Sequence, residues 1–376
     1  MKPSMSLLLH AGAPSSPRLL MICAVMAAAG LASTPARAQQ TTSTDDGGAE
    51  LKGWAFVLEN DLLGTNNAKD RWYTNGMQLM LAFQKGREPE LLKSTLSWGR
   101  WLVPQDCEGD GCAVTLNTVL GQNIYTPRHV NVVEPQPRDR PWAGWLYGGI
   151  GMSNFNGNRH QVLAFKAGPT GPTSFAEGTQ KAAHCCLGSS KEPMGWDNQL
   201  RPRLGVQLSY LSTDYHFVDS PVGMQTSWGG AVGNVRTFVR GAVAVTWSPA
   251  GGQGRGMQSG GLDEGEFFTP DFSAHATRGT LMDSLRHTVF YAHMQVSAVA
   301  YNVFLQGQTY KGRSEIDPER LVGTSTVGFS VPLGERGQHK LGMAWKRRTP
   351  EFEVRGDDPN RDRYQSWGVL SYSRDL

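Results

Sequence analysis

The stretch 237-TFVRGAVAVTW-247 decides the fold class, because its residues alternate with a period of two. One face carries Val239, Val243, Val245 and Trp247, and the opposite face carries Arg240, Ala242, Ala244 and Thr246. This alternation predicts a β-strand with one apolar face and one small or polar face. The same pattern recurs in 203-RLGVQLSYL-211, 326-TVGFSVPL-333 and 341-LGMAWKR-347.

Alternation alone does not separate a soluble β-sandwich from a membrane barrel. The small and polar face opposite each apolar row resembles a barrel interior. Aromatic residues near strand ends resemble the aromatic girdle of a membrane protein; they are Trp54, Trp72, Tyr73, Trp142, Trp145, Tyr147, Trp247 and Trp367. We therefore predict an all-β fold, an outer-membrane antiparallel β-barrel of about 12 strands.

The N-terminal segment predicts export. Lys2 and Arg18 precede the apolar run 19-LLMICAVMAAAGLAS-33, and 36-ARA-38 is a small-residue cleavage site. These features predict a secretory signal peptide over 1–38 with cleavage after Ala38. We expect a flexible segment over 39–50 and one barrel domain over 51–376, located in the bacterial outer membrane as a monomer.

The formal charge gives no support for a nucleic-acid partner. The whole chain carries +3, and the predicted signal peptide holds Lys2, Arg18 and Arg37 with no acidic residue. Removal of this segment therefore brings the formal charge to zero, and a neutral chain has no global attraction for polyanions.

One segment, 173-TSFAEGTQKAAHCCLGSS-190, interrupts the strand pattern. Ser174 and Glu177 have capping-box spacing, so we expect a short helix from about Phe175 to Leu187. In a barrel this helix must lie in a loop, which we place near the extracellular rim. Gln180 and His184 share one helix face, and a neutral histidine can take a proton from water.

A second polar cluster lies in 58-LENDLLGTNNAKDRWYTNGMQL-79, which we interpret as a hairpin. Its acids and amides are consistent with either a solvated loop or a site for a hard cation. Asp61 with loop carbonyls and water suits Ca²⁺, and the Asn60 amide could donate to an oxyanion. On the second strand we expect Tyr73, Met77, Leu79, Leu81 and Phe83 to face lipid, and Thr74, Gly76 and Gln78 to face the interior.

Cysteine and serine residues supply no nucleophile motif. Cys107 and Cys112 share a polar loop, and in an exported protein a local disulfide is the first interpretation. The adjacent Cys185 and Cys186 are expected to be small buried residues. The sequence contains no Gly-x-Ser-x-Gly motif, which argues against a serine esterase of the α/β-hydrolase type.

Several of these segments resemble the LpxR family of outer-membrane lipid A 3′-O-deacylases. The resemblance begins with 59-ENDLLGTNNAKDRWYTNG-76 and continues in 121-GQNIYTP-127, 139-DRPWAGWLYGG-149 and 168–200. It extends from about Gly53 to the C-terminus. It implies a 12-stranded barrel that hydrolyses the ester holding the acyloxyacyl chain on lipid A, at a site between the barrel wall and a loop helix.

The resemblance also implies roles for individual residues. His184 would be the general base, and Gln180 matches a glutamine one turn before it. Asn60 matches the oxyanion amide, Asp61 the calcium ligand, and Thr74 the threonine of the Tyr-Thr-x-Gly motif. Arg128 follows Tyr-Thr-Pro, where a basic residue would meet a lipid A phosphate. The implied cofactor is Ca²⁺, and the implied partner is lipopolysaccharide.

Two other functions stay open from the residues alone. A porin or structural barrel would need none of the polar set Asn60, Asp61, Thr74 and His184. A barrel phospholipase would act on glycerophospholipids through a serine nucleophile, for which the sequence offers no convincing Ser-His pair.

Overall fold

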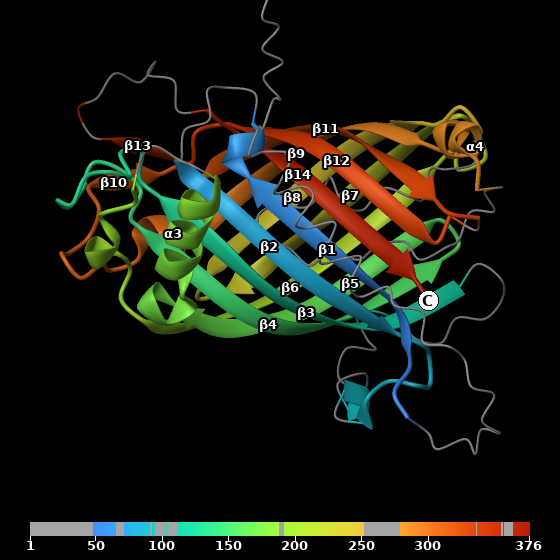
Figure 1. The fold of residues 1–376 in the computed structure, drawn as a ribbon, viewed down its shortest axis with the longest axis horizontal. Coiled ribbons are helices and arrows are strands. Elements are labelled where there is room, and N and C mark those ends of the chain that lie inside the picture. Colours follow the sequence, from blue (N-terminus) through green and yellow to red (C-terminus); the bar gives the residue numbers. More distant parts are fainter. Residues whose placement is uncertain are drawn as a thin grey trace, which may run out of the picture.

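The computed structural model describes residues 48–64, 71–90, 92–94, 103, 112–187, 192–251, 279–335, 337–354, 356 and 364–376. Twelve strands form one closed barrel in the order β1-β14-β12-β11-β9-β8-β7-β6-β5-β4-β3-β2 (Figure 1). Every paired neighbour is antiparallel, and the first and last strands meet to close the wall. The predicted antiparallel barrel of about 12 strands is confirmed.

The strand bounds follow the alternating segments of the sequence. The barrel strands are β1 Leu51–Asn60, β2 Trp72–Phe83, β3 Cys112–Thr126, β4 Ala143–Asn156, β5 Arg159–Thr170, β6 Arg203–His216, β7 Val222–Gly233, β8 Arg236–Trp247, β9 Val289–Asn302, β11 Leu321–Leu333, β12 His339–Arg348 and β14 Gln365–Asp375. A separate two-stranded sheet pairs β10 (Ile316–Pro318) with β13 (Phe352–Val354).

The helices are short and lie between strands. They are α3 (Ala176–Leu187), α4 (Leu281–Arg286) and α5 (Val303–Gln306), with 3-10 turns η1 (Asp61–Leu63), η2 (Gly171–Ser174) and η3 (Trp196–Asn198). The expected loop helix is thus present within one residue of its expected start. Among the described residues, none of the helices is long and apolar enough to cross a membrane.

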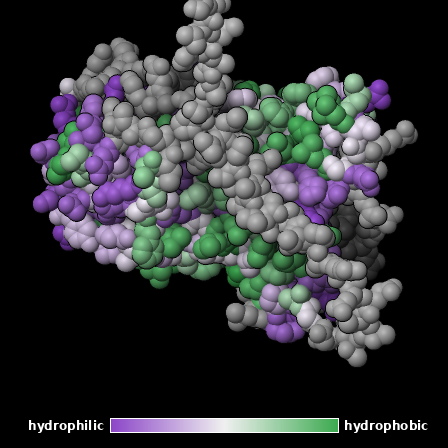
Figure 2. Space-filling view, in the orientation of Figure 1, coloured by the Kyte–Doolittle hydropathy of each residue, from purple (hydrophilic) through white to green (hydrophobic). Residues whose placement is uncertain are grey.

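The wall is apolar outside and polar inside, which identifies a membrane barrel rather than a soluble sandwich. On β9, Met294 and Val296 are more than half exposed, whereas the intervening Gln295 and the next residue, Ser297, are buried. A soluble protein places these residue classes the other way round. Figure 2 shows apolar surface over the middle of the wall and polar surface at the left-hand end. An extended exposed apolar surface of this kind is solvated by lipid.

The interior is filled rather than open. Large side chains from several strands pack in one buried cluster, in which the α5 residue Phe304 stacks on Tyr125 with ring centroids 4.1 Å apart. We expected small and polar side chains in the interior, and the structure adds large aromatic ones. Six of the eight aromatics that we assigned to a girdle are buried, namely Trp72, Tyr73, Trp142, Trp145, Tyr147 and Trp367. They fill the interior or hold loops, so most of the predicted girdle is wrong.

The Glu59 carboxylate holds the seam where the barrel closes. It accepts hydrogen bonds from Lys346 of β12 at 2.8 Å, Tyr73 of β2 at 2.5 Å and Trp367 of β14 at 3.3 Å. Side chains of Glu59 and Lys346 are both nearly inaccessible to solvent. One carboxylate thus joins β1 to three other strands.

Loss of this carboxylate should weaken the barrel. Glu59→Leu removes the Glu59 counter-charge from the buried Lys346 ammonium, and breaking a buried ion pair costs about 3–5 kcal/mol. We expect a lower urea midpoint for the purified barrel in detergent, followed by the gel mobility of unboiled samples. The double variant Glu59→Leu/Lys346→Met removes both charges and should recover part of the loss. A single variant as stable as the parent would contradict this role.

Candidate functional site

A β-bulge at the start of β2 decides which side chains face outward. The register shifts between Tyr73 and Asn75, so Tyr73 pairs with Tyr125 and Asn75 pairs with Ile124. Tyr73 points inward to Glu59, and Gly76 leaves room for the Tyr73 hydroxyl, because a Cβ there would clash with it. The expected inward position of Thr74 and outward position of Tyr73 are therefore both wrong.

Thr74 instead belongs to the outer face of the wall. It is buried, and its hydroxyl lies 2.7 Å from the hydroxyl of Thr126 on β3. Thr126 is two residues from Ile124, so both lie on the same face of β3. Ile124 packs outside the barrel with Trp142 and Ala176, the first residue of α3. Thr74 thus faces the same side of the wall as α3.

Asn60 and Asp61 stand at the end of β1, beside this face. Asn60 pairs with Asn75, and its Oδ1 caps η1 by accepting from the Leu62 amide at 2.8 Å. Its side-chain Nδ2 makes no hydrogen bond to the described residues, so this amide keeps its donor capacity. Asp61 is buried, and its Oδ2 accepts from the Arg71 amide at 3.0 Å.

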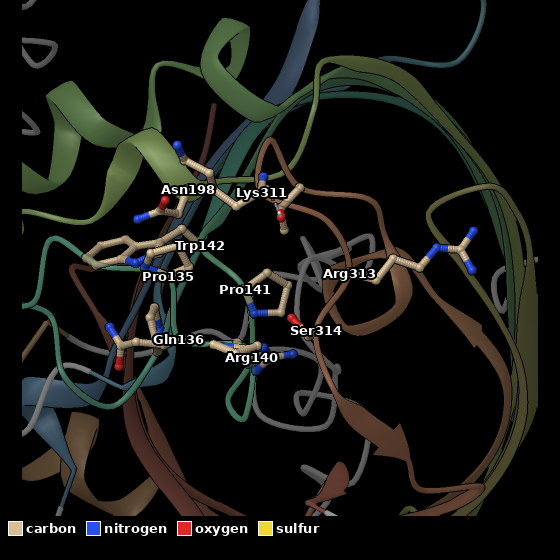
Figure 3. Close-up of a pocket in the computed structure, with 12 residues that line it drawn as sticks. Pro135, Gln136, Arg140, Pro141, Trp142, Asn198, Lys311, Arg313 and Ser314 are labelled. Carbon is tan, nitrogen blue, oxygen red and sulfur yellow. Dashed lines mark hydrogen bonds between the residues drawn. The ribbon is translucent and has the colours of Figure 1, made fainter.

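The helix α3 rests on the outside of β3 and β4. Gly144 of β4 pairs with Ile124, and a Cβ at this glycine would overlap Ser174 and Ala176. Gln122 of β3 donates to the Ser174 carbonyl at 2.7 Å, which fixes the turn before the helix. Figures 1 and 3 both show the helix outside the ring of strands. The Ser174 hydroxyl donates to the Gly171 carbonyl oxygen and accepts from no amide of α3, so the expected capping box is absent.

The register therefore gathers the predicted residues on four neighbouring strands. An outer row runs from Asn60 through Asn75 and Ile124 to Gly144, the seat of α3. Neighbouring strands lie about 4.8 Å apart, so the row spans roughly 14 Å. It brings Asn60 and Thr74 to one stretch of wall, with α3 above the adjoining strands.

Gln180 and His184 are both buried on α3. Gln180 Oε1 accepts from the indole N–H of Trp196 at 2.9 Å. Its Nε2 makes no hydrogen bond to any described residue, so the expected direct orientation of the His184 ring by Gln180 is not seen. Glu177, on the same helix, pairs with Lys181 at 2.7 Å and is partly exposed.

Arg128 lies at the start of the β3–β4 connection, one residue beyond Pro127. Its side chain is half-buried, and its backbone amide donates to Asp139 Oδ2 at 2.8 Å. Asp139 also accepts from Trp72 and from the Arg140 amide. Burial raises the pKa of Asp139, and these N–H donors act in the opposite direction.

A calcium ion would find oxygen donors at the end of β1. Among the described residues, no three His, Cys, Asp or Glu side chains come close enough to hold a metal. Asp61 supplies a buried carboxylate there, and loop carbonyls and water would have to complete the coordination. Oxygen donors of this kind suit Ca²⁺ rather than a softer ion.

Sequence reasoning missed the residues that support the site. Trp196 binds Gln180, Thr126 binds Thr74, and Asp139 ties the β3–β4 connection to Trp72. All three residues lie in the motifs that carry the family resemblance. The motifs could therefore have pointed to these residues, but the sequence did not show what each of them contacts. Cys107 lies outside the described residues, as do the side chains of Cys112 and Cys186. Cys185 is exposed and free, which corrects its expected burial.

Comparisons with known proteins agree with this fold. No curated protein matches the sequence. LpxR from Salmonella typhimurium is similar in structure, with a TM-score of 0.63 and 18% identity over 86% of this chain and 100% of that one. The β-domain of the Bordetella autotransporter BrkA and the translocator domain of NalP from Neisseria meningitidis score 0.40 and 0.39, each with 8% identity. The first covers 86% of this chain and 98% of its own, and the second 96% of both.

The family model described as outer membrane protein LpxR matches residues 19–376, which is nearly the whole chain. The matched range contains β1, β2 and α3 with every candidate site residue. The chain belongs to the LpxR family of outer membrane proteins.

Proposed function

We propose that this protein is a Ca²⁺-dependent lipid A 3′-O-deacylase, which hydrolyses the ester that holds the 3′-acyloxyacyl chain on lipid A. One observation carries the proposal: a polar set sits on the lipid-facing side of the wall. Asn60, Asp61 and Thr74 lie at the end of the β1–β2 hairpin, and Gln180 and His184 are buried on a helix over the same face. A membrane barrel has no structural need for such residues there.

The location suits an acyl-chain substrate. The wall below the site is apolar and exposed, with Leu79 on β2 and Leu120 on β3 facing outward. Acyl chains of a lipid lie along such a surface, while the sugar and phosphate groups stay at the rim. An ester between the two parts of the lipid reaches the level of Asn60 and Thr74 without leaving the membrane.

His184 acts as the general base in the proposed reaction. Its imidazole takes a proton from a water molecule while that water attacks the ester carbonyl carbon. The Asn60 Nδ2 group, whose partner Oδ1 is fixed on the Leu62 amide, donates to the oxyanion that develops. The C–O bond to the sugar then breaks, and the alkoxide takes the proton from His184, so the products are a carboxylic acid and an alcohol.

Thr74 and Gln180 are proposed to position the substrate. The bond to Thr126 fixes the Thr74 hydroxyl, and the bond to Trp196 fixes the Gln180 carboxamide. A Ca²⁺ bound at Asp61 would supply positive charge beside the oxyanion. Arg128 is proposed to meet a lipid A phosphate, since an arginine binds phosphate oxygens well.

The filled interior does not favour the porin alternative. Phe304 packs against Tyr125 and Trp145 in the lumen near the rim. The second alternative, a phospholipase with a serine nucleophile, has no specific support among the described contacts. Mass spectrometry of lipid A from cells with and without the protein tests the proposal. Loss of a mass that equals the 3′-acyloxyacyl chain supports it, and unchanged lipid A in an assay with active LpxR as control overturns it.

Removal of the base should nearly abolish turnover. For His184→Ala we expect a rate lower by ~10²–10⁴-fold, the usual contribution of a general base. The parental rate should rise with pH through the range where imidazoles lose their proton, because only the neutral ring accepts one. Lys181→Ala, an exposed position on the same helix, is the matched control. A folded His184→Ala barrel that deacylates lipid A at the parental rate would exclude this assignment.

The metal requirement can be tested separately. Chelation should stop deacylation, and Ca²⁺ should restore it better than Mg²⁺, which demands stricter octahedral geometry. Asp61→Asn keeps the side-chain shape but weakens Ca²⁺ binding, so a higher Ca²⁺ concentration should be needed for half-maximal rate. Glu335→Gln, an exposed acid at the opposite rim, should leave that concentration unchanged. Full activity of the parent in excess chelator would remove the metal from the proposal.

A further inference from the structure

A separate pocket opens at the mouth of the barrel, away from the outer face that carries α3. Three connections form its walls: β3–β4, the segment with η3, and β9–β11 (Figure 3). Its lining includes three cations, Arg140, Lys311 and Arg313, and no aspartate or glutamate. A concave site with one sign of charge concentrates ions of the opposite sign.

Main-chain and side-chain hydrogen bonds hold the three walls together. The Glu315 amide donates to the Pro137 carbonyl at 2.5 Å, and Tyr310 donates to Gln199 at 3.2 Å. Asn198 Nδ2 donates to the Val133 carbonyl at 2.7 Å. The pocket is therefore formed by the fold of the loops and does not need a ligand to assemble it.

Two buried side chains of the lining keep unused N–H donors. Arg140 is fully buried; its Nη1 donates to Glu351 at 3.1 Å, but its Nε and Nη2 make no hydrogen bond to a residue that the structure describes. The indole N–H of Trp142 is likewise buried without an acceptor among the described residues. A buried donor without an acceptor is unfavourable, so a ligand rich in acceptors would be stabilised in the pocket.

Several buried guanidinium groups gather around one carboxylate beneath the pocket. Glu351 faces Arg140, Arg348 and Arg236; burial alone would raise the pKa of its carboxyl, but these three guanidinium groups lower it to about 2. The Asp139 carboxylate nearby already accepts from Trp72 and from the Arg140 amide.

We infer that this pocket binds a phosphate group. A phosphate offers several oxygen acceptors for the unused N–H groups of Arg140, and its negative charge is attracted by the positive charges of Lys311 and Arg313 in the β9–β11 wall. The group could be free phosphate or part of the headgroup of a lipopolysaccharide. This site uses none of the proposed catalytic residues and does not depend on the proposed hydrolysis.

The test is phosphate binding to the purified full-length barrel in detergent, measured by isothermal titration calorimetry. Lys311 and Arg313 are exposed, so the variant Lys311→Gln/Arg313→Gln should fold. We expect it to bind inorganic phosphate roughly tenfold more weakly, since two positive charges that attract the anion are removed. The charge-matched control Lys85→Gln/Arg286→Gln changes two exposed cations at the opposite rim and should bind as the parent does.

A second arm of the titration uses lipid A in mixed micelles, with the His184→Ala background to prevent turnover. Tighter binding of lipid A than of inorganic phosphate, with the same loss in Lys311→Gln/Arg313→Gln, identifies a headgroup as the source of the phosphate. Tighter binding of inorganic phosphate identifies a free anion. The inference is overturned if the parent binds neither probe, or if the two double variants bind both probes equally well.

Discussion

The buried Glu59 carboxylate is the constraint on which both the barrel and the site depend. It lies on the inner face of β1 and accepts from Tyr73, Lys346 and Trp367, which belong to the strands on both sides of the closing seam. A buried charge is tolerated only with its partners in place. The strands must therefore keep the relative positions that allow these hydrogen bonds. Because side chains alternate along a strand, the inward anchor of Glu59 sends the next residue, Asn60, outward. The network inside the barrel thereby fixes a group on its lipid-facing side.

The same coupling explains the bulge in β2. Tyr73 must turn inward to reach Glu59, and Gly76 must also face inward because it pairs with Glu59. Residues three apart on a regular strand face opposite sides, so the strand needs an extra residue between them. The bulge supplies it, and Thr74 leaves the interior for the face that carries α3. A feature of the interior hydrogen bonding thus determines the composition of the outer polar set.

The sequence predicted the barrel well and the site in part, for identifiable physical reasons. Alternation in segments such as 237–247 is a property of each strand alone, so the class and approximate number of strands could be predicted. The inward turn of Tyr73 could not, since nothing local in 72-WYTNG-76 reveals a carboxylate on another strand. The burial of Trp145, Tyr147 and Trp367 was missed for the same reason, because aromatic rings fit a girdle or a filled lumen equally well by composition. Helical spacing predicted that Gln180 orients His184. The side-chain oxygen of Gln180 instead accepts a hydrogen bond from Trp196, sixteen residues further along the chain.

A filled lumen and an outer polar set are consistent with each other in energetic terms. A chain that places polar side chains outside the wall needs a rigid wall behind them, and the packed aromatic rings of Tyr125, Phe304 and Trp145 provide it. Polar groups facing hydrocarbon are costly unless other groups shield them. Here α3 covers the wall beside them, and Gly144 allows the helix to approach closely. The helix thus shields part of the outer face, and the buried Gln180 and His184 of α3 show that polar side chains are covered there.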